Sequence, residues 1–175
     1  MRRDYIEWQD RSSPLAFLIT IRCYGTWLHG DERGSMDRAE NNVYRAPKIA
    51  PKVAFQESDR RQLKHPPITL DTARRSAVDA AIREFAEYRQ TRLYSLNVRT
   101  NHAHLVIGAS DKPEKLMTSI KAYSTRRLRE LSLVGPEDRI WSRHGSTRWL
   151  WTEDHISQAC DYVALGQGGD LPMFD

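Results

Sequence analysis

The 175-residue chain is moderately basic, with 27 Lys and Arg against 23 Asp and Glu, a net charge of +4 and an isoelectric point of about 9.2. No apolar run approaches the roughly 18 residues of a membrane span, and the first residues lack the apolar core of a signal peptide. The two cysteines, Cys23 and Cys160, form no Cys-x-x-Cys pattern, which excludes a structural zinc finger. We therefore expect one cytoplasmic domain over residues 1–175 with reduced thiols.

The first predicted element is a central β-strand over residues 15–24, a stretch rich in apolar and β-branched side chains. Residues 29–68 contain four prolines and two glycines without a clear hydrophobic period. This composition predicts a long loop or insertion, and loops of that length in compact domains are usually functional or partly disordered.

A helix is predicted over residues 71–90, with Thr69 or Asp71 as its N-cap. Val78, Ile82 and Phe85 would form its apolar stripe. Residues 93–99 then predict a strand with Tyr94, Leu96 and Val98 facing the core.

A second strand follows a tight turn at Thr100 and Asn101, so the two strands are expected to form an antiparallel hairpin. In this second strand Ala103, Leu105 and Ile107 would occupy one face, while His102 and His104 would occupy the other.

A second helix is predicted from Pro113 to about Leu133, and a further strand over residues 146–152. The last helix begins after Thr152, an N-cap residue followed by two acids, and ends at Gly166. The apolar stripe of the second helix would consist of Leu116, Ile120, Tyr123, Leu128 and Leu131.

The order β-α-β-β-α-β-α predicts an α+β fold, because its first six elements form the split βαβ, or ferredoxin-like, arrangement. Such an antiparallel sheet has helices on one face and an open face on the other. The open face would present a polar, partly cationic platform formed by Thr20, Arg22, Asn97, Arg99, His102 and His104.

The two imidazoles on one strand face suggest half of a metal site, because histidine is the commonest metal ligand at neutral pH. Ordinary strand surface is the alternative. Positive charge is also concentrated, since residues 112–148 contain nine Lys or Arg against four acids. This segment suits a polyanion such as nucleic acid, although a solvated helix face is an equal alternative.

Three stretches resemble the single-tyrosine HUH transposases, and among them the REP-associated tyrosine transposases of the IS200-like superfamily. They are Asn101-His102-Ala103-His104-Leu105-Val106, residues 120–124 (Ile-Lys-Ala-Tyr-Ser), and Asp161-Tyr162-Val163. The resemblance covers residues 15–24 and about 71–167. It implies a bacterial, nucleoid-associated protein that acts in DNA transposition or recombination.

The resemblance implies metal-dependent cleavage and rejoining of single-stranded or hairpin DNA through a 5′-phosphotyrosine link. Mg²⁺ or Mn²⁺ would be the cofactor, with two imidazoles leaving coordination positions for the scissile phosphate. Tyr162 is the expected nucleophile, since the family places it on the last helix. Tyr123 is the alternative, but it lies on an apolar stripe.

The third metal ligand stays open between Gln167, Gln158 and His155, with Gln167 favoured because Gly166 can end the helix and turn the next residue inward. Some relatives have Gln or Asn four residues after the tyrosine, whereas this chain has Gly166 there. A homodimer is compatible with the resemblance. The expected DNA contacts are Arg22, Arg99, Lys121, Arg126, Arg127, Arg129, Arg143 and Arg148.

Trp141, Trp149 and Trp151 are candidates for stacking on unpaired bases. The rival functions are a non-catalytic nucleic-acid-binding ferredoxin-like domain and a domesticated nuclease that cuts chromosomal repeats. A histidine-triad hydrolase is disfavoured, because Val106 stands where a third histidine is needed.

Overall fold

The computed structural model describes residues 13–26, 58 and 60–165. Its sheet is fully antiparallel with the strand order β2-β3-β1-β4, which is the predicted ferredoxin-like arrangement. Most of the predicted insertion, and Gln167 with the segment around it, lie outside the described residues. The elements are β1 Ala16–Cys23, α2 Thr72–Tyr88, β2 Leu93–Val98, β3 His102–Gly108, α3 Pro113–Glu130, β4 Trp141–Leu150 and α4 Glu153–Ala164.

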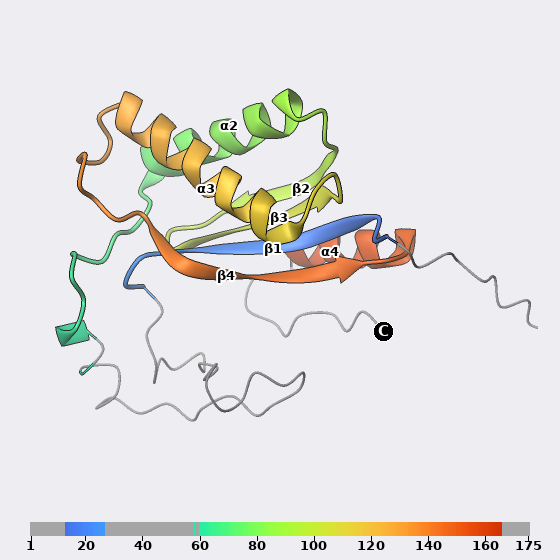
Figure 1. Cartoon of the computed structure of the whole chain (residues 1–175), viewed down its shortest axis with the longest axis horizontal. Coiled ribbons are helices and arrows are strands. Elements are labelled where there is room, and N and C mark those ends of the chain that lie inside the picture. Colours follow the sequence, from blue (N-terminus) through green and yellow to red (C-terminus); the bar gives the residue numbers. More distant parts are fainter. Residues whose placement is uncertain (1–12, 27–57, 59, 166–175) are drawn as a thin grey trace, which may run out of the picture.

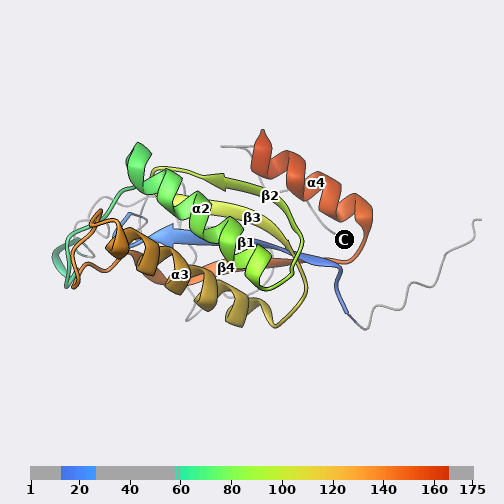
Figure 2. The same ribbon diagram turned by 90° about the horizontal axis from the view of Figure 1, so that it is seen from above.

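Helices cover both faces of the sheet, as Figures 1 and 2 show: α2 and α3 lie on one face and α4 on the other. The larger core, under α2 and α3, includes Ile19, Ile21 and Leu105. Strand β1 is central and almost wholly buried, which explains why its first four residues, 16–19, form an apolar run rather than an alternating pattern.

The second core corrects the expectation of an open face. Ile156, Ala159 and Val163 of α4 pack on Leu18 and Val106 of the sheet. Burying Ile156 and Val163 stabilises this docking by roughly 3 to 6 kcal/mol, at the usual value per side chain. The covered face therefore brings the last helix against the strand that contains the histidines.

Strand β2 also departs from its predicted alternation. Leu96 and Val98 pack toward α2 and α3, but Tyr94 packs on the α4 side. The cause is an irregularity in the pairing with β3 between Leu93 and Ser95, which shifts the facing of the residues before it.

The helix caps agree with the sequence more closely than the helix ends do. The side chain of Asp71 accepts a hydrogen bond from the Arg74 amide, and that of Thr152 accepts one from the His155 amide. Helix α3 ends at Glu130 rather than near Leu133, and Leu131 is 52% exposed instead of joining the stripe. Ser132, at φ 53°, turns the chain away from the helix.

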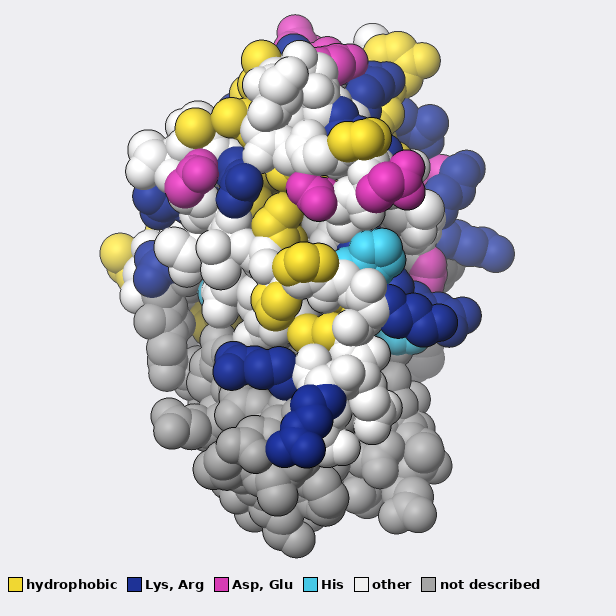
Figure 3. Space-filling model, turned by 90° about the vertical axis from the view of Figure 1, so that its left-hand side faces the viewer, with side chains coloured by type: hydrophobic (Ala, Val, Ile, Leu, Met, Phe, Trp, Pro, Cys, Tyr) yellow, Lys and Arg dark blue, Asp and Glu magenta, His cyan; other side chains and the backbone are white. Residues whose placement is uncertain are grey.

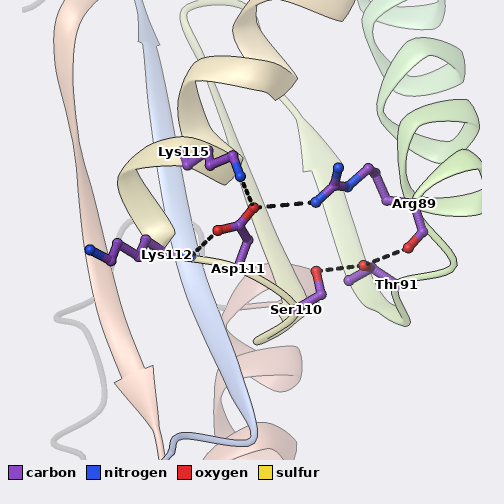
Figure 4. Close-up of polar contacts among 6 residues, drawn as sticks. All are labelled: Arg89, Thr91, Ser110, Asp111, Lys112 and Lys115. Carbon is purple, nitrogen blue, oxygen red and sulfur yellow. Dashed lines mark hydrogen bonds and ion pairs between the residues drawn. The ribbon is translucent and has the colours of Figure 1, made fainter.

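Asp111 joins the end of α2 to the start of α3 (Figure 4). Its carboxylate contacts the Lys115 ammonium at 2.6 Å and the Arg89 guanidinium at 3.2 Å, and accepts the Lys112 amide at 2.9 Å. The hydrogen bonds from the Lys115 ammonium and the Lys112 amide, with the charges of Lys115 and Arg89, hold the pKa of Asp111 below its usual value. Beside it, the Thr91 and Ser110 hydroxyls are 2.6 Å apart.

Neither thiol forms a disulfide, as expected. Burial raises the pKa of the Cys23 thiol to about 12, so this side chain is an inert part of the core. Among the described residues, no helix is both long and apolar enough to cross a membrane.

Strand β4 begins at Trp141, five residues earlier than predicted, because a bulge interrupts its pairing with β1. Gly145 lies opposite Ile21, while Trp141 lies opposite Cys23, so four β4 residues span two β1 residues. The Lys121 ammonium closes the bulge by donating to the carbonyls of Ser142, Arg143 and His144 at 2.9, 3.4 and 3.2 Å.

Gly145→Ala is predicted to destabilise the fold by about 1 to 3 kcal/mol, the usual range for overpacking. A methyl group there would collide with the Thr20 carbonyl oxygen and approach the Met117 sulfur to 2.8 Å. Gly108→Ala is the matched control, since its nearest neighbours would be 3.6 Å away. Urea unfolding followed by circular dichroism measures both, and equal stabilities would contradict the close packing at the bulge.

Candidate active site

The two histidines of β3 lie side by side on the α4 face of the sheet. Their ring centroids are 4.6 Å apart, with an angle of 72° between the ring planes. In the pairing of β3 with β1, His102 lies opposite Arg22 and His104 opposite Thr20. The alternation read from the sequence thus produces the expected juxtaposition of imidazoles.

Each ring has a hydrogen-bond partner at Nδ1. For His102 the partner is the Asn101 side-chain oxygen, at 2.6 Å. For His104 it is the Thr20 hydroxyl, at 2.8 Å and buried within the sheet. A ring held at Nδ1 has its other nitrogen, Nε2, as the atom suited to metal coordination.

His104 is held in its neutral form. Burial is the main reason that its pKa is lowered to about 3, and the charges of His102, Arg22 and Arg99 act in the same direction. A neutral imidazole is the form that binds a metal ion. The pair therefore fits a divalent cation as two ligands, while the described residues contain no cluster of three or more His, Cys, Asp or Glu.

Tyr162 projects from α4 against this pair. Its ring centroid lies 5.4 Å from that of His104, in an edge-to-face arrangement. The Asn97 amide donates to the Val163 carbonyl at 3.0 Å, which ties the helix to β2 one residue beyond the tyrosine. Asn97 is itself opposite His104 in the sheet, so one strand pair positions both the ring and the helix.

The phenol of Tyr162 is half-buried. Burial raises its pKa above the usual value, while the Arg22 guanidinium acts in the opposite direction. Arg22 thus influences both His104 and Tyr162, which makes it a central cation of the platform.

Tyr123 lies elsewhere. Its ring packs edge-on against Phe85, 5.1 Å away, in the contact region of α2 and α3, and the Arg126 guanidinium lies over it at 4.6 Å. The sheet therefore lies between Tyr123 and the histidines, and Tyr123 packs against the core as its position on the apolar stripe predicted.

The three candidates for a third ligand differ in their positions. Gln167 falls outside the described residues. His155 lies in the first turn of α4, where its Nδ1 accepts the Trp151 amide at 3.3 Å. Gln158 is an exposed residue in the middle of α4.

The predicted cations fall into separate groups. Arg22 and Arg148 lie on the histidine face of β1 and β4, and the Arg99 amide pairs with the His102 carbonyl. Arg127 forms an ion pair with Glu84 of α2. Two neighbouring hollows share Lys121 and run along α3, and their other basic residues are Arg126, Arg129, Arg143 and His144.

Figure 3 views the molecule from the end where α3 finishes and β4 begins. Lys and Arg side chains gather along one margin of this surface, and acidic side chains are interspersed higher up.

The three tryptophans proposed to stack on bases lie in two places, because Trp141 is separate from Trp149 and Trp151, whose ring centroids are 5.6 Å apart. Trp141 is buried in the α2–α3 core and donates its indole N–H to the Lys121 carbonyl at 3.2 Å. Trp149 is exposed, but it packs edge-on against Phe17 of that same core, 5.6 Å away. It therefore lies on the sheet face opposite the histidines.

Comparison with known protein families identifies one match. The family described as "Transposase IS200 like" matches residues 61–163, more than half of the chain. The chain belongs to the IS200-like transposase family. Members of this family are DNA transposases, typically metal-dependent HUH endonucleases.

Two solved structures are similar to this family member. One, a REP-associated tyrosine transposase bound to a REP hairpin, is 12% identical with a TM-score of 0.49, covering 95% of this chain and 70% of the other. The second, from Deinococcus radiodurans R1 and assigned as a transposase, is 14% identical with a TM-score of 0.43, covering 97% and 98%. No curated protein sequence matches, so the family assignment rests on the family match.

Acid is predicted to destabilise the metal-free transposase through His104. Because its pKa falls from 6.5 in the unfolded chain to about 3 in the fold, the unfolded state binds the extra proton. Stability is therefore complete above about pH 6.5 and decreases as the pH falls toward 3. Between pH 6.5 and 5 the loss is up to about 2 kcal/mol.

His104→Gln lacks the titrating ring, so its stability should change less over the same interval. Urea unfolding in the presence of a chelator, at pH 7, 6 and 5, compares the two slopes. Parallel pH dependences would contradict the buried neutral imidazole.

Proposed function

We propose that this transposase-family protein is a metal-dependent single-stranded DNA endonuclease and strand transferase. It forms a 5′-phosphotyrosine intermediate at hairpin or repeat DNA. The observation that supports the proposal most directly is the edge-to-face packing of the Tyr162 and His104 rings, whose centroids are 5.4 Å apart, beside the charge of Arg22.

In the proposed reaction the Tyr162 phenolate oxygen attacks the scissile phosphorus. A new bond forms between that oxygen and phosphorus, and the bond from phosphorus to the 3′ oxygen breaks. The phenolic proton passes to solvent, and the departing 3′ oxygen takes up a proton to become a hydroxyl. Reversal of these steps with another 3′ hydroxyl rejoins DNA without a nucleotide triphosphate.

His102 and His104 would hold Mg²⁺ or Mn²⁺, with Gln167 proposed as the third ligand. When bound, the cation withdraws charge from the phosphate as its P–O bond breaks. The role of the chain's own residues would be to keep His104 neutral, and to hold the two rings adjacent and within reach of the phenol.

The platform arginines are proposed to hold the DNA strand beside the phenol. Arg22, Arg99 and Arg148 share the histidine face, so we assign them to the phosphates nearest the scissile bond. The group along α3, which is Lys121, Arg126, Arg127, Arg129 and Arg143, is proposed to contact the DNA farther from the reacting phosphate.

Tyr162→Phe is predicted to abolish a covalent protein–DNA adduct, because the variant keeps the ring but lacks the attacking oxygen. The assay incubates labelled single-stranded hairpin DNA with Mn²⁺ and resolves the products on a denaturing gel. The double variant His102→Ala/His104→Ala is expected to lose the adduct as well.

Tyr123→Phe is the matched control and should form the adduct at the wild-type rate. A wild-type protein that binds the hairpin without ever forming an adduct would instead indicate the non-catalytic nucleic-acid-binding alternative. An adduct that disappears in Tyr123→Phe and persists in Tyr162→Phe would overturn the choice of nucleophile.

Arg148→Ala is predicted to weaken hairpin binding and to reduce the slope of log affinity against log salt concentration by about 1, the effect of losing one phosphate contact. Arg83→Ala is the control, since the Arg83 guanidinium is paired with Asp79 on α2 at 2.6 Å. Fluorescence anisotropy at several salt concentrations measures both slopes. An unchanged slope in Arg148→Ala would place its side chain away from the DNA.

A further inference from the structure

The buried contact between Thr20 and His104 is chemically ambiguous. The Thr20 hydroxyl oxygen lies 2.8 Å from Nδ1 of His104, and Thr20 is only 5% exposed. A hydroxyl can donate to an unprotonated Nδ1 or accept from a protonated one, and each role corresponds to a different tautomer of the neutral ring.

The neighbouring histidine does not share this ambiguity. The Asn101 amide presents its oxygen to Nδ1 at 2.6 Å, and in this orientation the oxygen accepts a hydrogen bond that Nδ1 of His102 donates. The Asn101 backbone is fixed as well, because its carbonyl accepts the Cys23 amide at 2.9 Å and the Thr26 hydroxyl at 3.3 Å. His102 is therefore held with its lone pair on Nε2.

We propose that Thr20 and Asn101 are positioning residues that hold both histidines in the Nδ1–H tautomer. In this arrangement the Thr20 oxygen accepts the proton of His104, so both Nε2 atoms have a lone pair for the same cation. The inference rests on the proposed function, since both rings need the same tautomer only if both of them coordinate the same cation. It assigns a role to a buried polar side chain in the middle of the central strand.

Such positioning residues are needed because a neutral imidazole populates both tautomers unless a hydrogen bond stabilises one of them. Burial of His104 shields Nδ1 from solvent, and the Thr20 hydroxyl is its hydrogen-bond partner. Coordination of a cation through Nε2 would then require this hydroxyl to accept the Nδ1 proton. Hydrogen-bonding partners of this kind typically change metal affinity by about 10- to 100-fold.

The test begins without metal or DNA. In uniformly ¹⁵N-labelled protein at neutral pH, long-range ¹H–¹⁵N correlation spectra identify which ring nitrogen is protonated. We expect Nδ1–H at His102 and His104 in the wild type and in Thr20→Ser. In Thr20→Val, which keeps the shape but lacks the hydroxyl, His104 should shift toward Nε2–H.

The second measurement is Mn²⁺ binding to the same proteins, followed by electron paramagnetic resonance. Thr20→Val should weaken the affinity about 10- to 100-fold, and Thr20→Ser should stay close to the wild type. Asn101→Leu provides the equivalent change at His102. Thermal unfolding of each variant verifies that the fold is intact.

An Nε2–H signal from His104 in the wild type would overturn the proposal, and this spectrum needs no variant. Unchanged Mn²⁺ affinity in a folded Thr20→Val would overturn it equally. Neither readout involves Tyr162 or DNA cleavage. If the wild-type protein shows the expected tautomers but does not cleave DNA, the proposed nuclease chemistry would therefore be refuted, while the positioning roles of Thr20 and Asn101 would remain.

Discussion

The pairing of β3 with β1 is the constraint on which the rest of the structure depends. Ala103, Leu105 and Ile107 are fully buried under α2 and α3, and this burial fixes which face of β3 is left for His102 and His104. A slip of one residue would place the imidazoles in the apolar core, at a large cost in desolvation. The stability of the core and the geometry of the site therefore both depend on the same strand register.

The same strand pairing determines which residues surround the histidines. Register places Thr20 and Asn97 on either side of His104, one bonding to its ring and the other to the backbone of α4. Helix α4 is held independently by Ile156 and Val163 in the second core. Two different interactions, apolar packing and one amide hydrogen bond, thus position the Tyr162 ring, and a change in either one alone would leave the other in place.

The sequence was sufficient for features that depend on periodicity and capping. The alternation along residues 102–107, the caps at Asp71 and Thr152, and the element order all followed from local pattern, and the strand order followed from the fold they define. Three features could not be predicted in this way: the placement of Tyr94, the early start of β4 and the burial of Trp141. Each of them depends on a bulge that shifts the alternation of a strand. The role of Thr20 was also hidden, since a hydrogen bond across 84 residues leaves no local signal.

The distribution of charge explains why such a site suits a phosphate more than a metal ion alone. The described charges that act on His104, from His102, Arg22 and Arg99, are all positive, and the two rings coordinate without any negative charge of their own. A divalent cation approaching this platform is repelled by the arginines, whereas a DNA phosphate is attracted by them and adds an anionic ligand. Binding of either one lowers the electrostatic cost of the other, and this coupling is reciprocal. In the proposed reaction the substrate would complete the metal site, which is a physical reason for a cleavage centre to have imidazoles among arginines rather than a cluster of carboxylates.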